Sequence, residues 1–389
     1  MPIEIKPEQI QALRDHFQKR ETEILALTRA VVEAESPSGD EVCSAKVVSL
    51  LSSSARNING STAIDRIPSE GYGVHLRVRF GPLHHRMPPL VIIGHTDTVH
   101  PRGSIDVRPW RVEGNRIYGP GIFDMKANCV IALEAFRACD ALGFVPTRPV
   151  NLVLTCDEEN GSPAGRGLVE SETRGAGAVL VLEPSASGGR VKTARKGTGM
   201  FKLTVHGRAA HAGLDPEKGV SAVLELARQT IRLHAMNDPE QGTTVTVGTV
   251  SGGTHSNVVP DQAEAEIDVR FSSAEAGRWL EDQIFDLEPF DARTRLVITG
   301  GINRPPLERT EKVASLYEHA RTMAGMLNFE LGETSVGGAS DGNFVGALGV
   351  PVLDGLGVQG DGAHAAHEHI LADDIPLRGA LLAGLITTL

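Results

Sequence analysis

Histidine and acidic side chains follow short apolar runs repeatedly along this sequence of 389 residues. These residue types are ordinary ligands of divalent ions such as zinc, cobalt and manganese. The carboxyl ends of parallel strands form one edge of an open α/β sheet, so side chains that follow successive strands come together there. The candidates are His95 and Asp97 after residues 90–93, Asp124 after a Gly-Pro-Gly turn, Glu158 and Glu159 after residues 151–156, Glu183 after residues 179–182, and His364, His367 and His369 in the loop after residues 351–353.

Two histidines and three carboxylates are a suitable donor set for a pair of divalent ions, because the carboxylates and one bridging hydroxide offset the charge of the ions. Such a site generates a nucleophile from water and binds the oxygen of the scissile group. Asp97, two residues after His95, is placed to hold the second nitrogen of that imidazole. One of Glu158 and Glu159 would bind metal, while the other would stay available as the general base.

Each candidate also has an ordinary structural explanation. A single acid after a strand is usually a solvated loop residue, and His95 with Asp97 alone is equally well a core histidine with a hydrogen-bonded partner. Their joint occurrence after successive apolar runs favours the metal site. In the C-terminal loop, the spacing leaves open which of the three histidines would bind a metal.

The elements that must position these residues alternate in type. Apolar residues recur at helical spacing up to about residue 55, and short β-branched runs then alternate with helix-like segments such as 125–142. This alternation predicts an α/β fold with a mainly parallel sheet flanked by helices. From about residue 195 the order is strand, helix, strand, strand, helix, strand, which is one ferredoxin-like α+β unit. We therefore predict a discontinuous catalytic domain, residues 1–194 and 304–389, with an α+β domain of residues 195–303 inserted into it.

The composition argues against two classes of partner. Lys and Arg total 38 against 49 Asp and Glu, a formal net charge of −11. Such a chain repels a phosphate backbone and an anionic membrane surface, so we expect neither nucleic acid nor membrane as a partner. The sequence has no run of about 18 apolar residues, and its N-terminus has no basic flank leading into an apolar stretch. We therefore expect a cytoplasmic protein.

The motifs around these candidates resemble, in the same order, those of the M20 metallopeptidase family. The matching segments are residues 94–99, 118–126, 157–159 and 183–184, and the similarity extends from about residue 20 to the C-terminus. The segment Gly-Pro-Gly-Ile-Phe-Asp-Met-Lys at residues 119–126 is most similar to the glutamate carboxypeptidase branch, the carboxypeptidase G2-like enzymes.

The resemblance implies a role for each candidate. It implies two zinc ions per subunit, with Co²⁺ or Mn²⁺ as substitutes, and Asp124 as the carboxylate that bridges them, followed by a cis peptide bond to Met125. The other implied roles are His95 and Glu183 as ligands of one ion, Glu159 and His364 as ligands of the other, Glu158 as the general base and Asp97 as the catalytic partner of His95.

Two stretches near these ligands bear on the match with the family. The family's C-terminal motif is a histidine with an acid about four residues on, which His364 and Glu368 fit, with His367 as the alternative ligand. Ala127 and Asn128 stand where the family usually has glycines. We expect a packing change there and an intact metal site.

The inserted domain resembles the family's lid and dimerisation domain. The histidine of its motif, His211 here, reaches the active site of the partner subunit and helps to stabilise the tetrahedral oxyanion. Without the family context, His211 could equally start a helix. Asn257, Arg270, Arg304 and Gly338 match substrate-binding positions. A guanidinium binds a carboxylate in a bidentate fork, although surface solvation is the ordinary alternative for both arginines.

Together these features predict a homodimeric dinuclear zinc amidohydrolase or exopeptidase. Its substrates would be N-acyl amino acids or small peptides with a free α-carboxylate, and C-terminal glutamate would be one candidate product. An aminoacylase or an N-acetyl-amino-acid deacetylase, similar to those acting on acetylornithine, is the first alternative. A non-catalytic protein that binds metal or an amino acid is the second.

Overall fold

The computed structural model describes residues 5–82 and 86–389, which fold into two compact units. The first unit comprises residues up to 193, 309–335 and 340–389, and the second comprises residues 194–308 and 336–339. The second unit thus extends to Glu308 and includes a short segment that the sequence analysis assigned to the catalytic domain. Arg195 accounts for this segment, because its Nη1 donates to the carbonyl oxygens of Gly338 at 2.9 Å and Ala339 at 3.4 Å.

A mixed sheet forms the centre of the first unit. Its strands within the described residues are β1 (Ser61–Ser69), β2 (Gly73–Phe80), β3 (Leu90–His95), β6 (Val150–Thr155), β7 (Ala178–Val181) and β16 (Val352–Leu353), in the order β1-β2-β6-β3-β7-β16. Strands β6, β3, β7 and β16 run parallel, while β2 pairs with both of its neighbours in antiparallel register. The parallel strands are nearly continuous apolar runs because helices cover both faces of the sheet. The predicted α/β class with a mainly parallel sheet is confirmed.

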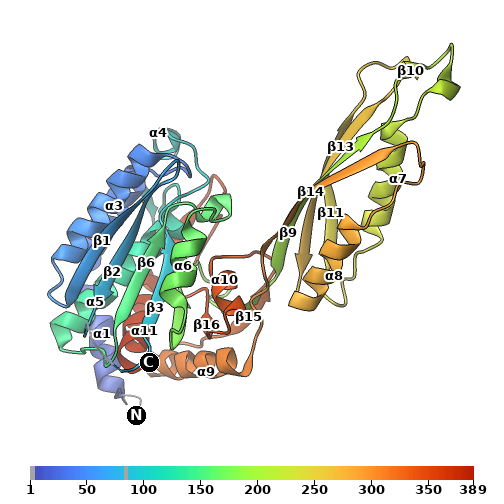
Figure 1. Cartoon of the computed structure of the whole chain (residues 1–389). Helices are drawn as coiled ribbons and strands as arrows, with labels where there is room; N and C mark the ends of the chain where they lie inside the picture. The colour runs from blue at the N-terminus through green and yellow to red at the C-terminus, as the bar shows by residue number, and fades with distance from the viewer. Residues whose placement is uncertain (1–4, 83–85) are drawn as a thin grey trace. The chain divides into compact units, whose positions relative to one another are not determined.

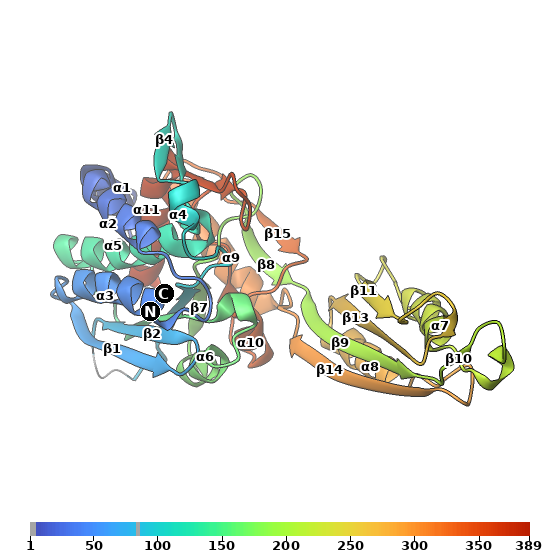
Figure 2. The same cartoon turned by 90° about the horizontal axis from the view of Figure 1, so that it is seen from above.

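Helices cover both faces of this sheet. The helices of the first unit within the described residues are α1 (Pro7–Lys19), α2 (Glu21–Glu33), α3 (Glu41–Arg56), α4 (Ser104–Val107), α5 (Ala127–Leu142), α6 (Gly165–Thr173), α9 (Glu311–Met326), α10 (Gly342–Ala347) and α11 (Ile375–Thr388). Figures 1 and 2 show α1, α2, α3, α5 and α11 on one side of the sheet and α6 and α10 on the other. None of the helices in the described ranges combines the length and apolar character needed to span a bilayer.

The last helix, α11, packs directly against the first, α1. Ile10, Leu13 and Phe17 form the buried stripe of α1, and glycines on α11 let this stripe approach closely. A Cβ atom at Gly379 would lie 2.2 Å from the Phe17 ring, and one at Gly384 would lie 2.4 Å from Ile10. Helices α1 and α11 therefore belong to one core.

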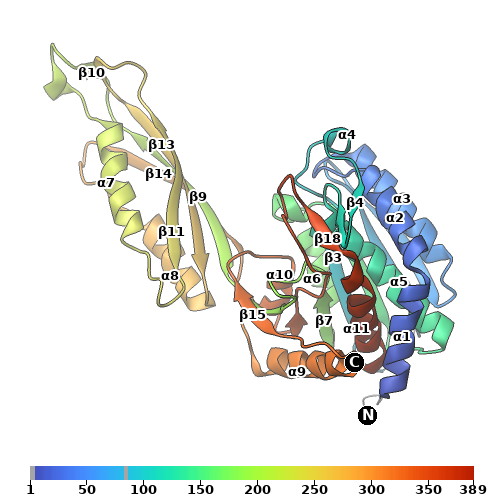
Figure 3. The ribbon, with the colours of Figure 1, turned by 180° about the vertical axis from the view of Figure 1, so that it is seen from behind.

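A small antiparallel sheet joins two segments that are distant in sequence. It consists of β17 (Gly360–Asp361), β18 (His369–Leu371), β5 (Arg116–Tyr118) and β4 (Arg111–Glu113), in that order, and Figure 3 shows β18 and β4. His369 pairs with Tyr118 across β18 and β5. The C-terminal histidine loop thereby lies beside the segment that leads to Asp124.

The second unit has the predicted ferredoxin-like order. Its main strands are β9 (Gly197–His206), β11 (Thr244–Gly252), β13 (Gln262–Phe271) and β14 (Arg295–Arg304), with helices α7 (Ala222–His234) and α8 (Ala274–Phe285). The antiparallel sheet order is β11-β13-β9-β14. Ser221 caps α7 and Ser273 caps α8, each accepting a backbone N–H with its side chain. The short strands β10 (Ala210–His211) and β12 (Val258–Val259) pair with each other, and β8 (Val191–Arg195) and β15 (Glu333–Val336) lie where the chain passes between the units.

Candidate metal centre

Asp124 lies between two groups of potential metal ligands in the first unit. His95 Nε2 lies 3.2 Å from Asp124 Oδ1 and 3.5 Å from Glu183 Oε1. On the other side, His364 Nε2 lies 3.4 Å from Asp124 Oδ2 and 3.2 Å from Glu159 Oε2. Within each group the donor atoms lie within 4.8 Å of one another. One carboxylate thus presents a different oxygen to each group, which is the arrangement that a bridging ligand requires.

A tight turn presents Asp124. Gly121 has φ 71°, in the left-handed region that favours glycine, and its Cα packs so closely on Thr98 that a Cβ would lie 2.3 Å from that side chain. The turn η1 (Ile122–Lys126) then departs from helical geometry at Asp124 and Met125 before α5 begins. The peptide bond between these two residues is cis, as the resemblance implied.

Asp97 supports His95 with both its backbone and its side chain. His95 Nδ1 lies 3.0 Å from the carbonyl oxygen of Asp97 and 3.4 Å from its Oδ1. Either oxygen favours a proton on Nδ1, so Nε2 is left as the nitrogen that faces Asp124 and Glu183. The second-nitrogen contact predicted for Asp97 is present, and the closer acceptor is its carbonyl.

The same Asp97 carboxylate also holds the turn that carries the two adjacent acids. Its Oδ1 accepts the backbone N–H of Glu158 at 3.2 Å, and its Oδ2 accepts that of Glu159 at 3.1 Å. Ser38 donates its hydroxyl to Oδ2 at 2.6 Å. The sequence around Ser38 does not indicate this role, because Ser38 lies in a loop far from every motif. The two acids are therefore oriented by a buried residue of the His95 motif.

The C-terminal loop brings His364 to the site and directs its neighbours elsewhere. His364 has φ 64°, an uncommon conformation for a residue with a side chain, and its ring faces Asp124 and Glu159. His369 is buried against the Tyr118 ring, and its Nδ1 lies 3.0 Å from the carbonyl oxygen of His367. Of the three histidines in this loop, His364 is the one in a ligand group of the described residues.

In the second unit, His211 and Asn257 lie together. Ala212 N–H donates to the Asn257 carbonyl at 2.9 Å, and His211 pairs with Val258 across β10 and β12. The exposed His211 ring accepts the backbone N–H groups of Gly213 at 3.1 Å and Leu214 at 3.2 Å at Nδ1. These contacts place the proton of a neutral ring on Nε2, so that nitrogen is a hydrogen-bond donor.

The two predicted substrate arginines share one row of the second unit's sheet. Arg270 on β13 and Arg304 on β14 are both paired with Thr198 of the intervening strand β9. Residues directly opposite in an antiparallel sheet project from the same face. Arg270 also makes a bidentate ion pair with Asp268, at 2.8 and 2.7 Å. The Arg270 guanidinium therefore has the forked geometry with which arginine binds a carboxylate.

Comparison with known proteins identifies the family. The model of Peptidase family M20/M25/M40 matches residues 91–388. The chain belongs to this family.

Carboxypeptidase G2 of Pseudomonas sp. strain RS-16 is 29% identical over 307 residues, covering 77% of this chain and 74% of that protein. Succinyl-diaminopimelate desuccinylase of Dechloromonas aromatica is 31% identical over 321 residues, covering 76% and 81%. The crystal structure of aminopeptidase PepT from Bacillus cereus shares the fold, with a TM-score of 0.76 at 19% identity over 95% of this chain and 98% of that one. This M20 protein is a metal-dependent peptidase or amidohydrolase.

The electrostatics of the M20 site fit bound cations. Burial opposes charge on His95, but its contacts with Asp124, Asp97 and Glu183 raise its pKa well above the ordinary value. Asp124 and Glu159 raise the pKa of His364 to about 10. Burial raises the pKa of Glu159, and its Oε1 is buried without a hydrogen-bond partner in the described structure. These carboxylates raise the pKa of the neighbouring histidines because they attract positive charge, and one carboxylate oxygen has no hydrogen-bond partner in the described structure. A bound divalent ion would supply positive charge and contact that oxygen.

The departure from the family's glycines is accommodated by packing. Asn128 is buried at the start of α5, and its Oδ1 accepts the Val358 N–H at 3.0 Å. Gly357 lies against it, where a Cβ would come 2.2 Å from Asn128 Nδ2. A glycine on the facing loop thus makes room for the larger side chain, and the ligand groups remain together.

A further buried group, His75, Cys156 and Asp157, also has potential ligand atoms close together. Its His75 and Asp157 side chains form hydrogen bonds to backbone N–H groups of the fold. His75 Nδ1 accepts the Cys156 N–H at 3.2 Å, and Asp157 Oδ2 accepts N–H groups of the α6 N-terminus at 2.7 and 2.9 Å. Burial raises the pKa of the Cys156 thiol, which disfavours the thiolate form that binds metal.

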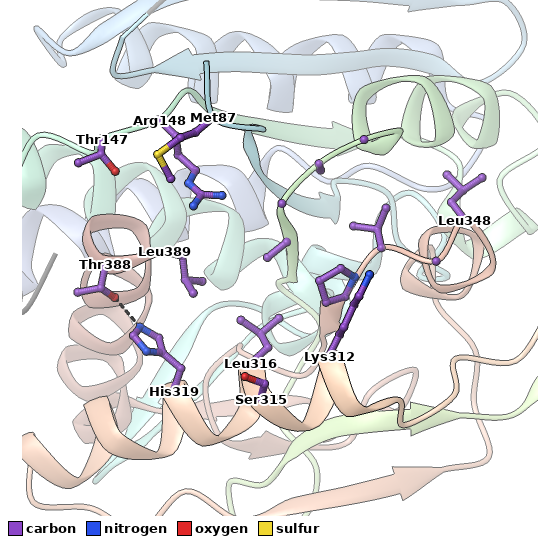
Figure 4. A pocket seen from close by; sticks show the side chains of 17 residues that line it. Met87, Thr147, Arg148, Lys312, Ser315, Leu316, His319, Leu348, Thr388 and Leu389 are labelled. Carbon is purple, nitrogen blue, oxygen red and sulfur yellow. Dashed lines mark hydrogen bonds between the residues drawn. The ribbon is translucent and has the colours of Figure 1, made fainter. Parts of the chain in front are cut away.

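The first unit also contains a cavity of about 820 Å³ at the opposite edge of the sheet (Figure 4). It is lined by residues that precede strands, including Thr147 and Arg148 before β6 and Pro351 before β16. His319 and Thr388 lie in its wall and contact each other at 2.7 Å. None of the proposed ligands lines this cavity. The cavity is therefore separate from the candidate metal centre, which is identified by its histidine and carboxylate side chains.

Proposed function

We propose that this M20 protein is a dinuclear zinc amidohydrolase or exopeptidase. Its substrates would be N-acyl amino acids or small peptides with a free α-carboxylate, with C-terminal glutamate as a product to test first. The observation that carries the proposal is the position of Asp124 between two groups that each add a histidine and a glutamate. His95, Asp124 and Glu183 would hold one ion, and Asp124, Glu159 and His364 the other, with Co²⁺ or Mn²⁺ as substitutes.

The ions, when bound, supply a hydroxide nucleophile from water at neutral pH and polarise the scissile carbonyl. The backbone N–H of Glu158 donates to Asp97 and fixes the position of this residue. The Glu158 carboxylate would take the proton of the attacking water and pass it to the leaving nitrogen. His211 of a partner subunit would donate its Nε2–H to the developing oxyanion. Its Nδ1 is occupied by backbone N–H groups, which supports this donor role.

A free carboxylate on the substrate is proposed because of the arginine row in the second unit. Arg270 and Arg304 flank Thr198, and a planar guanidinium recognises a carboxylate through two parallel hydrogen bonds. The carboxylate of Asp268 already occupies the Arg270 fork, so a substrate would compete with it there. Asn257 and Gly338 would line the same substrate site.

The proposed dimer would form through the second unit. Large apolar side chains are exposed on α7 and on the adjoining edge strand β11, namely Leu224, Ile231 and Val250. Strand β11, residues 244–252, contains no charged residue that would discourage edge-to-edge pairing. An exposed apolar helix beside an uncharged sheet edge is a typical self-association surface.

A substrate panel tests the proposed function. N-acyl glutamates, N-acetyl amino acids and dipeptides would each be incubated with enzyme supplied with Zn²⁺ or Co²⁺, and the release of free amine would be measured. We expect hydrolysis that stops after exhaustive chelation and returns with zinc. Faster turnover of N-acetyl amino acids would favour the deacetylase alternative, and no turnover across the panel would favour a binding protein. Activity that survives complete metal removal would refute the metal mechanism.

A further inference from the structure

Glu368 is a buried carboxylate whose partners all surround the Asp124 turn. Its side chain is 2% exposed. Oε1 accepts the backbone N–H of Phe123 at 2.9 Å and that of Asp124 at 3.0 Å. Oε2 accepts the Gly121 N–H at 2.8 Å and lies 2.5 Å from His100 Nε2. Four donors saturate the acceptor capacity of one carboxylate, so Glu368 is committed to this turn.

The place of Glu368 in the sequence links this turn to the second ligand loop. Glu368 lies four residues after His364, and its own N–H donates to the Ala365 carbonyl at 3.3 Å. Its carbonyl accepts the Gly119 N–H at 3.4 Å, next to the pairing of β18 with β5. One residue therefore contacts the Asp124 turn through its side chain and is part of the His364 loop through its backbone.

His100, Arg108 and Lys126 support the same carboxylate. His100 is buried, and its Nδ1 accepts from Arg108 Nη2 at 3.3 Å, which leaves Nε2–H to donate to Glu368. Arg108 also reaches the carbonyl of Ala365 at 3.5 Å. The buried ammonium of Lys126 is attracted to Glu368. Such partners offset the cost of burying a charge that binds no ion itself.

We propose that Glu368 is a positioning residue that sets the spacing between Asp124 and His364, and so the affinity of the second ion. This inference rests on the proposed function, because it assumes that these two residues bind metal. Glu368 is absent from the ligand groups found among the described residues, so it acts through the backbone of the turn. Replacing its carboxylate with an amide would turn an NH₂ group toward two donors, which would displace the turn.

Zinc affinity of the Glu368→Gln variant tests this role. Metal-free wild-type and variant proteins would be titrated with zinc against a chromophoric chelator, and Co²⁺ spectra would report the coordination geometry. We expect the second zinc to bind about 10- to 100-fold more weakly in Glu368→Gln. We also expect an altered Co²⁺ spectrum and partial recovery in Glu368→Asp.

Glu134→Gln is the matched control. Glu134 is also a buried glutamate with a histidine Nε2 partner, His16 at 2.8 Å, but its contacts are with Arg20 and Arg137 and with no proposed ligand. It should lose stability while both zinc affinities and the Co²⁺ spectrum stay unchanged. Equal loss of zinc affinity in both variants would mean a merely structural effect and would overturn the proposal.

Three further outcomes keep the test decisive. If Glu368→Gln does not fold, His100→Ala removes one donor from the same carboxylate and should weaken the second zinc several-fold; wild-type affinity in that variant would refute the proposal. Unchanged zinc binding in a folded Glu368→Gln would refute the positioning role alone. A wild-type protein that binds two zinc ions but hydrolyses no amide would refute the proposed function and leave the zinc comparison intact.

Discussion

At the scale of single residues, Asp124 would determine how many ions the proposed site can hold. Its two oxygens face different histidines, so each ligand group depends on it and on one glutamate of its own. The residues around it divide between direct donors and supports. Asp97 orients His95 and the Glu158–Glu159 turn, although in the proposed mechanism it would touch no reacting atom.

The zinc content of variants tests which of these residues bind the ions directly. Glu183→Gln and Glu159→Gln should each retain about one zinc ion per subunit, because each removes a ligand from one group only. Asp124→Asn should lose most of both ions, since both groups use its carboxylate. Metal analysis after dialysis against a weak chelator would check the series. Two tightly bound ions in Asp124→Asn would contradict the bridging role.

Glu158 should affect turnover without affecting metal content. In Glu158→Gln we expect kcat to fall by about 10²- to 10⁴-fold, the usual contribution of a general acid–base group, while zinc stays near two ions per subunit. Steady-state kinetics on the best substrate of the panel and metal analysis on the same sample would test both parts. Loss of zinc together with activity would show that Glu158 is a ligand.

At the scale of elements, the features predicted from the sequence were those with long, regular patterns. Helices α7 and α8 and strand β13 have clear periodicity and occur in the predicted order of strands and helices. The small sheet β17-β18-β5-β4 escaped prediction because two- and three-residue strands have no periodicity. Strand β1 was also missed, since it is half exposed at the sheet edge and contains Pro68.

The site was predictable to a similar extent. His95, Asp124 and Glu183 follow strands or a characteristic turn, so their sequence context marks them. The contacts of Ser38 and Glu368 could not be predicted, because their partners are 59 and 244 residues away in the chain. The choice between His364 and His367 depends on the backbone of the loop, which spacing does not determine.

Glu134 joins helix α5 to His16 of α1 and to Arg20 between α1 and α2, and the stability of this junction should depend on pH. Burial alone would raise the pKa of Glu134, but contacts with His16 and Arg20 lower it below the usual 4.5. A lowered carboxyl pKa stabilises the folded state above the unfolded pKa, and that contribution disappears as the pH falls through the folded pKa. Glu134→Gln should therefore be less stable than wild type by about 2 kcal/mol at pH 7, with the difference shrinking below pH 4.5. Urea unfolding across pH would measure it, and a constant difference would contradict the ionic origin.

At the scale of the whole molecule, the two units have separate cores and contribute different residues to the proposed site. The metal-ligand groups belong to the first unit, while His211, Asn257 and the arginine row belong to the second. The proposed enzyme therefore needs both units for catalysis. The proposed action of His211 on a partner subunit makes this requirement testable.

Subunit mixing tests whether His211 acts on its own subunit or on its partner. His211→Ala and Glu158→Gln should each be nearly inactive alone. In a mixed dimer, one site would combine the intact Glu158 of one subunit with the intact His211 of the other. Co-refolding equal amounts should then restore about a quarter of wild-type activity, because half the dimers are mixed and each has one complete site. No recovery in verified mixed dimers would place His211 in its own subunit's site.

The order of the ligands along the chain has a consequence for biosynthesis. His95, Asp124 and Glu183 all precede residue 194, where the second unit begins, whereas His364 follows both segments of that unit. On the ribosome, every donor of the first group has therefore been synthesised before the inserted unit emerges. The second group stays incomplete until His364, which follows the inserted unit, has been made. A nascent chain would therefore have the proposed ligands of one ion early, and those of the second only after the inserted unit has been synthesised.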